Sequence, residues 1–143
     1  MSNKIILSFE FQKEIDQVIR ELAKILPEGE QIKHERLHVA GVYFSGRMKI
    51  NLKIQPDYTK AFKCFYAGWH NNKCKLCAYN LAVDCYINGM GVKKGITTGL
   101  LLLKRLAVKY LHSSSKYTLE NIKNKTAWPS IKFTKKQWKI INS

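Results

Sequence analysis

Hydrophobic residues recur at spacings of three and four near the N-terminus and predict an amphipathic helix there. Between Phe11 and Leu26 the apolar positions share one face, and charged residues fill the opposite face. Proline cannot continue a helix, so Pro27 ends this element, which we expect over residues 11–26. A second, more uniformly apolar segment predicts a mostly buried helix over residues 99–112.

Other apolar stretches are shorter and alternate with polar residues, which is typical of half-buried strands. Ser45-Gly46 and Asn88-Gly89 stand between such stretches and are turn signals, the second typical of a hairpin. The sequence therefore predicts several short strands joined by tight turns. The predicted strands are residues 5–9, 37–44, 48–54, 62–67, 75–87 and 91–94.

Together these elements predict an α+β fold, in which an antiparallel sheet is packed by the two main helices. A chain of 143 residues that is 45% hydrophobic can form one core, so we expect a single domain over residues 1–143. Residues 113–143 show little periodicity and many lysines, and are predicted to be a basic C-terminal extension of that domain. No apolar run reaches the length of a membrane span, and no secretory signal is evident, so an intracellular location, cytoplasmic or nuclear, is expected.

Positive charge is concentrated in the second part of the chain. Residues 1–57 contain nine Lys and Arg against eight Asp and Glu, whereas residues 58–143 contain sixteen against two. Such an excess attracts polyanions, so nucleic acid is the expected partner. The alternative is a small viral or mobile-element interaction or inhibitor protein that docks on an acidic partner.

The candidate phosphate site is the loop before the second helix. A helix N-terminus presents unpaired N–H groups to an anion, and Lys93 and Lys94 precede it here, while Thr97 or Thr98 would be its N-cap. Further expected contacts come from three groups of residues. These are Lys104, Arg105 and Lys109 on the helix, Trp69, His70, Lys73 and Lys75 in a second contact, and Lys132, Lys135 and Lys136 near the C-terminus.

Three segments resemble the double-stranded RNA-binding domain. Gly68-Trp69-His70 is similar to the loop between its first two strands, Ala82 to Gly89 to its second strand and turn, and Gly95 to Thr98 to the glycine-rich entry of its last helix. The resemblance covers about residues 58–112. It implies a sheet packed by helices, phosphate contacts at the last helix, and RNA rather than DNA as the expected partner.

A second resemblance is to the GNAT acetyltransferases. Leu81 to Asp84, followed by Gly95 to Leu101, is similar to their strand, pyrophosphate loop and helix. Asn124 to Ala127 is similar to a later segment of that family. This resemblance implies an acyl-CoA-dependent N-acetyltransferase.

Four cysteines raise the question of a metal site. Cys64, His70, Cys74 and Cys77 could together bind zinc, since Cys74 and Cys77 form a chelating pair. In a strand, Cys77 and Cys85 would be roughly 26 Å apart and could not share an ion. Buried thiols are the favoured alternative, and no cofactor is expected. No standard catalytic motif is found, so we expect binding without catalysis.

Overall fold

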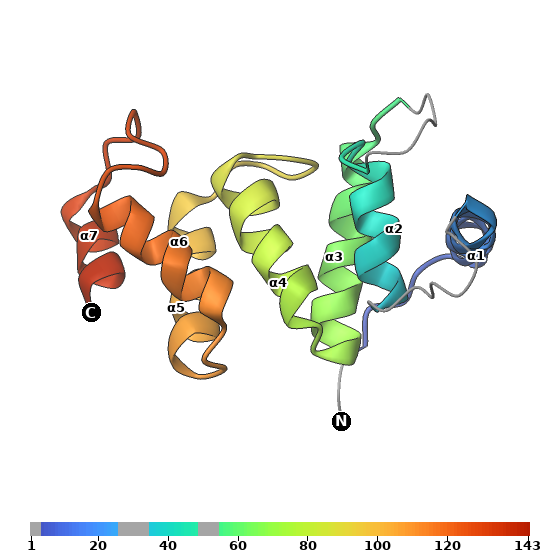
Figure 1. Ribbon diagram of the computed structural model, residues 1–143, viewed down its shortest axis with the longest axis horizontal. Coiled ribbons are helices and arrows are strands. Elements are labelled where there is room, and N and C mark those ends of the chain that lie inside the picture. Colours follow the sequence, from blue (N-terminus) through green and yellow to red (C-terminus); the bar gives the residue numbers. More distant parts are fainter. Residues whose placement is uncertain (1–3, 26–34, 49–54) are drawn as a thin grey trace. The chain divides into compact units, whose positions relative to one another are not determined.

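All regular elements in the described part of the chain, residues 4–25, 35–48 and 55–143, are helical in the computed structural model (Figure 1). The chain groups into two compact units, Met1–Cys77 and Ala78–Ser143, called unit 1 and unit 2 below. The prediction of a single domain stays a prediction. The helices are α1 (Phe9–Ile25), α2 (Arg36–Phe44), α3 (Tyr58–Asn72), α4 (Lys75–Asn80), the π-helix η1 (Leu81–Ile87), α5 (Ile96–Val108), α6 (Ser113–Lys123) and α7 (Lys135–Asn142).

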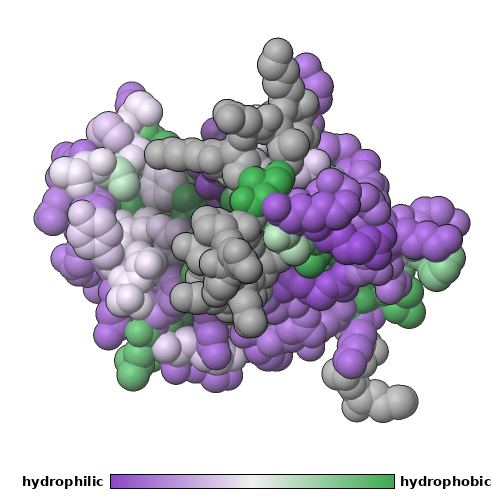
Figure 2. Space-filling view, turned by 45° about the vertical axis from the view of Figure 1, so that its right-hand side comes forward, coloured by the Kyte–Doolittle hydropathy of each residue, from purple (hydrophilic) through white to green (hydrophobic). Residues whose placement is uncertain are grey.

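Unit 1 is built on the pairing of α2 with α3, which lie side by side (Figure 1), and α1 packs on α2. The helix predicted over residues 11–26 is present as α1, and it buries Phe11, Ile15, Val18 and Leu22. Among the coloured residues of Figure 2, hydrophilic ones dominate the right-hand part of the view, paler ones lie on the left, and hydrophobic ones form small separate patches. Carboxylates cap the other two helices, because the side chains of Glu35 and Asp57 accept backbone N–H groups of α2 and α3.

Unit 2 forms its core around α5, which packs against η1, α6 and α7. Gly99 on α5 allows the closest of these approaches. A Cβ at Gly99 would lie 2.6 Å from Cγ1 of Ile87 and 2.8 Å from the carbonyl oxygen of Ala82. The helix predicted over residues 99–112 is thus present, but it runs from Ile96 to Val108. The buried core residues are Ala82, Ile87, Leu100, Leu103, Ala107, Leu119, Ile122 and Ile141.

The predicted α+β fold is wrong, because the described residues form no strand and no sheet. Residues 37–44 belong to α2, residues 62–67 to α3, and residues 75–87 form α4 and η1. Residues 5–8 and 91–94 have no regular structure, Phe9 begins α1, and residues 49–54 of the predicted strand 48–54 lie outside the described residues. Short apolar runs do not distinguish a strand from a buried helix, and here tertiary packing selects the helix.

The Asn88-Gly89 pair is a helix end and not a hairpin turn. Gly89 has φ +73°, and the N–H of Met90 donates to the carbonyl oxygen of Asp84 over 3.1 Å. A left-handed glycine directly after a helix, with such a bond back across the last turn, is a common way to end it. The same dipeptide suits both structures because both need a residue with positive φ.

Both family resemblances are wrong, because each implies a sheet and the described residues form none. The double-stranded RNA-binding domain and the acetyltransferases each place the helix start beside a strand, and here the element before α5 is the helix η1. Residues 113–143, predicted as an extension, contain α6 and α7 and supply Leu119, Ile122 and Ile141 to the core of unit 2. None of the described helices is long and apolar enough to cross a membrane.

Candidate nucleic-acid interface

The start of α5 has no side-chain cap. Gly95 is the N-cap residue, so Thr97 and Thr98 lie within the first turn, and the prediction that one of them is the N-cap is wrong. The first N–H groups of a helix have no partner within it. Lys93, Lys94 and Thr98 are exposed beside these N–H groups. The elements needed to hold an anion are therefore present at this helix start.

Two hydrogen bonds attach the C-terminal segment to the end of η1 and to the start of α5. Nε1 of Trp128 donates to Oδ1 of Asn88 over 3.0 Å, and Nε2 of Gln137 donates to Oγ1 of Thr97 over 3.1 Å. Each bond joins residues that are forty positions apart. A capping box between Thr134 and Gln137 fixes the first turn of α7, which orients Gln137 toward α5.

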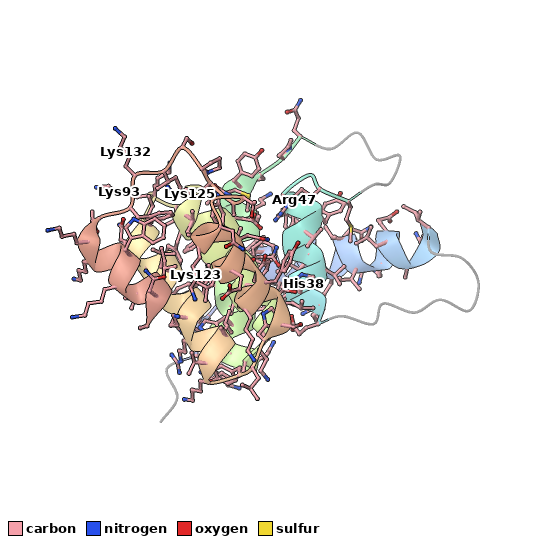
Figure 3. The ribbon with its side chains drawn as sticks, turned by 60° about the vertical axis from the view of Figure 1, so that its left-hand side comes forward. His38, Arg47, Lys93, Lys123, Lys125 and Lys132 are labelled. Carbon is pink, nitrogen blue, oxygen red and sulfur yellow. The ribbon has the colours of Figure 1, made fainter. Side chains whose placement is uncertain are left out.

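As a result, exposed lysines from two distant segments gather at one end of unit 2. Lys93, Lys125 and Lys132 lie at this end in Figure 3, and Lys135 and Lys136 stand in the first turn of α7, next to Gln137. Sequence analysis did not single out Lys125, since no periodicity marked its position. We call the following exposed residues the basic end: Lys93, Lys94, Lys125, Lys132, Lys135 and Lys136.

Lys104, Arg105 and Lys109 on α5 were predicted to continue this site, but Lys104 has other contacts. Nζ of Lys104 donates to the carbonyl oxygens of Ile141 and Ser143, over 3.0 and 2.8 Å, and so holds the end of α7. Burial, followed by the nearby charge of Lys123, lowers the pKa of Lys104. Lys109 lies roughly 20 Å along α5 from Ile96, at 1.5 Å per residue. A single phosphate at the helix start therefore cannot also reach Arg105 and Lys109.

The residues of the predicted second contact belong to unit 1. Trp69 is only 5% exposed, so its ring is not available for stacking on a base, and Nζ of Lys73 lies 5.2 Å from the ring centroid. His70 is exposed and packs on Tyr66, with 4.2 Å between ring centroids. Partial burial, followed by the charge of Lys73, lowers the pKa of His70. Lys75 is exposed at the start of α4.

The predicted zinc set is only partly assembled. Among the described residues, the possible ligand atoms of Glu35, Cys74 and Cys77 lie within 4.8 Å of one another, and neither Cys64 nor His70 joins them. Glu35 was not among the predicted ligands, because residues 37–44 were predicted to be a strand. In a helix, a carboxylate at position 35 can serve as the N-cap. The 26 Å separation of Cys77 from Cys85 was also wrong, since a helix rises only about 1.5 Å per residue.

Comparison of the chain with protein-family models, with curated proteins and with solved structures finds no match. The resemblances to the double-stranded RNA-binding domain and to the acetyltransferases thus have no support from relatives either.

Proposed function

We propose that unit 2 binds nucleic acid without catalysis and holds backbone phosphates at its basic end. One observation carries the proposal: two hydrogen bonds join the C-terminal segment to Asn88, at the end of η1, and to Thr97, in the uncapped first turn of α5, near Lys93 and Lys94. Residues that are far apart in the sequence thus form one cationic surface. A phosphate there would meet lysine side chains, the first N–H groups of α5 and the hydroxyl of Thr98.

The charge of unit 2 supports this partner. Residues 78–143 contain twelve Lys and Arg against two acidic residues, a net charge of +10. Of the two acids, Glu120 pairs with Lys123 at 3.2 Å, and Asp84 accepts a hydrogen bond from Asn80. Lysines that neutralise phosphates release counterions from the polyanion, and this release drives binding at low salt.

The same surface favours binding that is independent of base sequence. Trp128 and Trp138 are half-buried and pack against the core of unit 2, so they anchor the C-terminal segment and are poorly placed to stack on bases. The preference for RNA followed the family resemblance, which the fold contradicts, so the proposal is nucleic acid of either kind. Two carboxylates are also few for a nuclease that holds two divalent cations, which favours binding alone.

A binding panel tests the proposal on the whole chain. Single-stranded and double-stranded RNA and DNA oligonucleotides of one sequence, labelled with fluorescein, are titrated at two salt concentrations, and fluorescence anisotropy reports the affinity. We expect binding of at least one class that does not change when the base sequence is scrambled. We also expect a loss of at least tenfold in affinity between about 50 and 200 mM salt, because added salt lowers the free energy gained when several phosphate contacts release counterions.

Competition distinguishes this function from docking on an acidic protein. Unlabelled polynucleotide should displace the probe, while polyglutamate of equal charge should compete much less well, because a duplex carries a charge about every 1.7 Å, roughly twice the density of an extended polyglutamate chain. Absence of binding to all four probes at low salt would contradict the proposal. Tighter binding of polyglutamate than of any oligonucleotide would favour the acidic protein partner instead.

A further inference from the structure

Cys74 and Cys77 form a thiol pair in unit 1, away from the basic end in the sequence. Cys74 directly precedes α4, and Cys77 lies within that helix. The backbone N–H of Cys77 donates to Sγ of Cys74 over 3.1 Å. The two sulfur atoms also lie within 4.8 Å of each other. These are two thiols in contact, and not an isolated cysteine.

The two thiols have different surroundings. Cys77 is fully buried, and its sulfur lies against the backbone of α3, because a Cβ at Gly68 would be only 2.4 Å from it. Cys74 is half-buried and can be reached from solvent. One thiol can therefore meet a reactant in solution, whereas the other can meet only its neighbour.

The hydrogen bonds add a chemical difference. The side-chain hydrogen bond from Cys77 lowers the pKa of Cys74 to about 7, and the backbone N–H groups of Cys77 and Leu76 act in the same direction, although burial and Glu35 oppose them. The same thiol contact, with burial, raises the pKa of Cys77. Near neutral pH, about half of Cys74 is therefore the nucleophilic thiolate, whereas Cys77 stays protonated.

The backbone permits a disulfide between them. Residues three positions apart within a helix have Cα atoms about 5 Å apart, from a rise of 1.5 Å per residue and a radius of 2.3 Å. Cys74 lies directly before α4 and is held beside its first turn by the hydrogen bond from the N–H of Cys77 to Sγ of Cys74. Disulfides need a Cα separation of 4.4–6.8 Å. Closing the bond therefore requires side-chain rotation and little movement of the backbone.

We propose that Cys74 and Cys77 are a redox-active dithiol that exchanges with the disulfide of a low-molecular-weight thiol. The Cys74 thiolate attacks one sulfur of that disulfide, a mixed disulfide forms, and the other half leaves as a thiolate that takes up a proton. Cys77 then loses its proton and attacks Sγ of Cys74, which breaks the mixed disulfide and releases the second thiol. The chain is oxidised by two electrons, and the small disulfide is reduced to two thiols.

The two sulfur atoms could also supply two of the four ligands of a zinc site, with Glu35 as a third. The carboxylate of Glu35, however, already accepts other hydrogen bonds. Its Oε2 accepts from the N–H groups of Leu37 and His38, at 2.7 and 3.2 Å, and its Oε1 accepts from Nδ2 of Asn72 at 2.8 Å. This carboxylate fixes the start of α2 and ties it to the end of α3. These hydrogen bonds make Glu35 a poor third metal ligand, so they favour thiol chemistry at Cys74 and Cys77.

The experiment equilibrates the whole protein with mixtures of reduced and oxidised glutathione. Free thiols are then trapped by an alkylating agent and counted by mass spectrometry. We expect two of the four thiols to disappear together as the oxidised fraction rises. Trypsin cuts after Lys75, between the two cysteines, so a Cys74–Cys77 disulfide should join two peptides that otherwise separate. Retention of four alkylated thiols across all mixtures, or absence of the linked peptide, would overturn the proposal.

Variants assign the two roles. Cys77→Ser should accumulate a glutathione adduct on Cys74, Cys74→Ser should lose the transition, and Cys64→Ala with Cys85→Ala should keep it. In the wild-type protein the alkylation rate of Cys74 should be half-maximal near pH 7, since the thiolate forms as pH rises through its pKa. A midpoint near 9, the ordinary value for a thiol, would count against the pair. So would one tightly bound Zn²⁺ per chain that Cys74→Ser releases.

Discussion

Replacing Lys93, Lys94, Lys132 and Lys135 together by alanine is expected to weaken polynucleotide binding roughly 100-fold at about 0.15 M salt. All four side chains are exposed at the basic end, so their removal should leave the core of unit 2 unchanged. An exposed ion pair changes affinity by a few-fold, and four such pairs acting on one phosphate backbone reach about two orders of magnitude. Anisotropy titration of a labelled oligonucleotide measures the change.

A matched variant separates a located site from the general charge of the protein. Replacing Arg105, Lys109, Lys116 and Lys139 by alanine removes the same charge from exposed positions of the same unit. We expect this variant to lose at most about fivefold in affinity, since only the long-range attraction is weakened. Equal losses in the two variants would show that binding follows net charge and has no defined place on the surface.

The second large effect concerns stability. Leu103→Ala should lower the free energy of unfolding by about 3 kcal/mol, because Leu103 is fully buried in the core of unit 2 and the smaller side chain leaves a cavity. Leu101→Ala should change it by less than about 0.5 kcal/mol, since Leu101 is 53% exposed. Urea unfolding followed by tryptophan fluorescence measures both.

This pair of variants also tests the helix itself. In a helix Leu100, Leu103 and Ala107 share the buried face, and Leu101 points away from it. In a strand Leu101 and Leu103 would lie on one face, because side chains alternate. Losses of similar size for both leucines would therefore contradict α5 as described.

Sequence periodicity located two of the helices, α1 and α5. The pattern behind α1 extends over four turns with charged residues on the opposite face, so only a helix satisfies it. The run behind α5 was too long and too apolar for a typical strand. Both predictions erred only at the ends, by up to four residues.

The segment over residues 75–87 shows why the other elements were misjudged. Counting large apolar residues gives an alternating pattern at Cys77, Tyr79, Leu81, Val83 and Cys85, as in a strand. The structure instead buries Ala78 and Ala82 with Cys77, Leu81 and Cys85, which is a helical stripe at spacings of one and three. The small residues Ala78 and Ala82 mark the helical stripe, because helices that pack closely need small side chains where they meet. The wider turn of a π-helix in η1 further blurs the usual period.

Charge composition pointed to the basic part of the chain, but it could not assemble the site. Lys93 and Lys94 were recognisable because they precede a predicted helix start. The position of the C-terminal lysines depends on the hydrogen bonds of Trp128 with Asn88 and of Gln137 with Thr97. Contacts between residues forty positions apart leave no periodic trace in a single sequence.

The most direct test of the nucleic-acid proposal is the salt dependence of binding for Lys93→Ala with Lys94→Ala. Each phosphate contact contributes about 0.9 to the slope of log K against log salt for a duplex, and about 0.7 for a single strand. With both lysines replaced, we predict a slope smaller than that of the wild-type protein by about 1.4 to 1.8. A slope equal to the wild-type value would contradict phosphate binding at the start of α5.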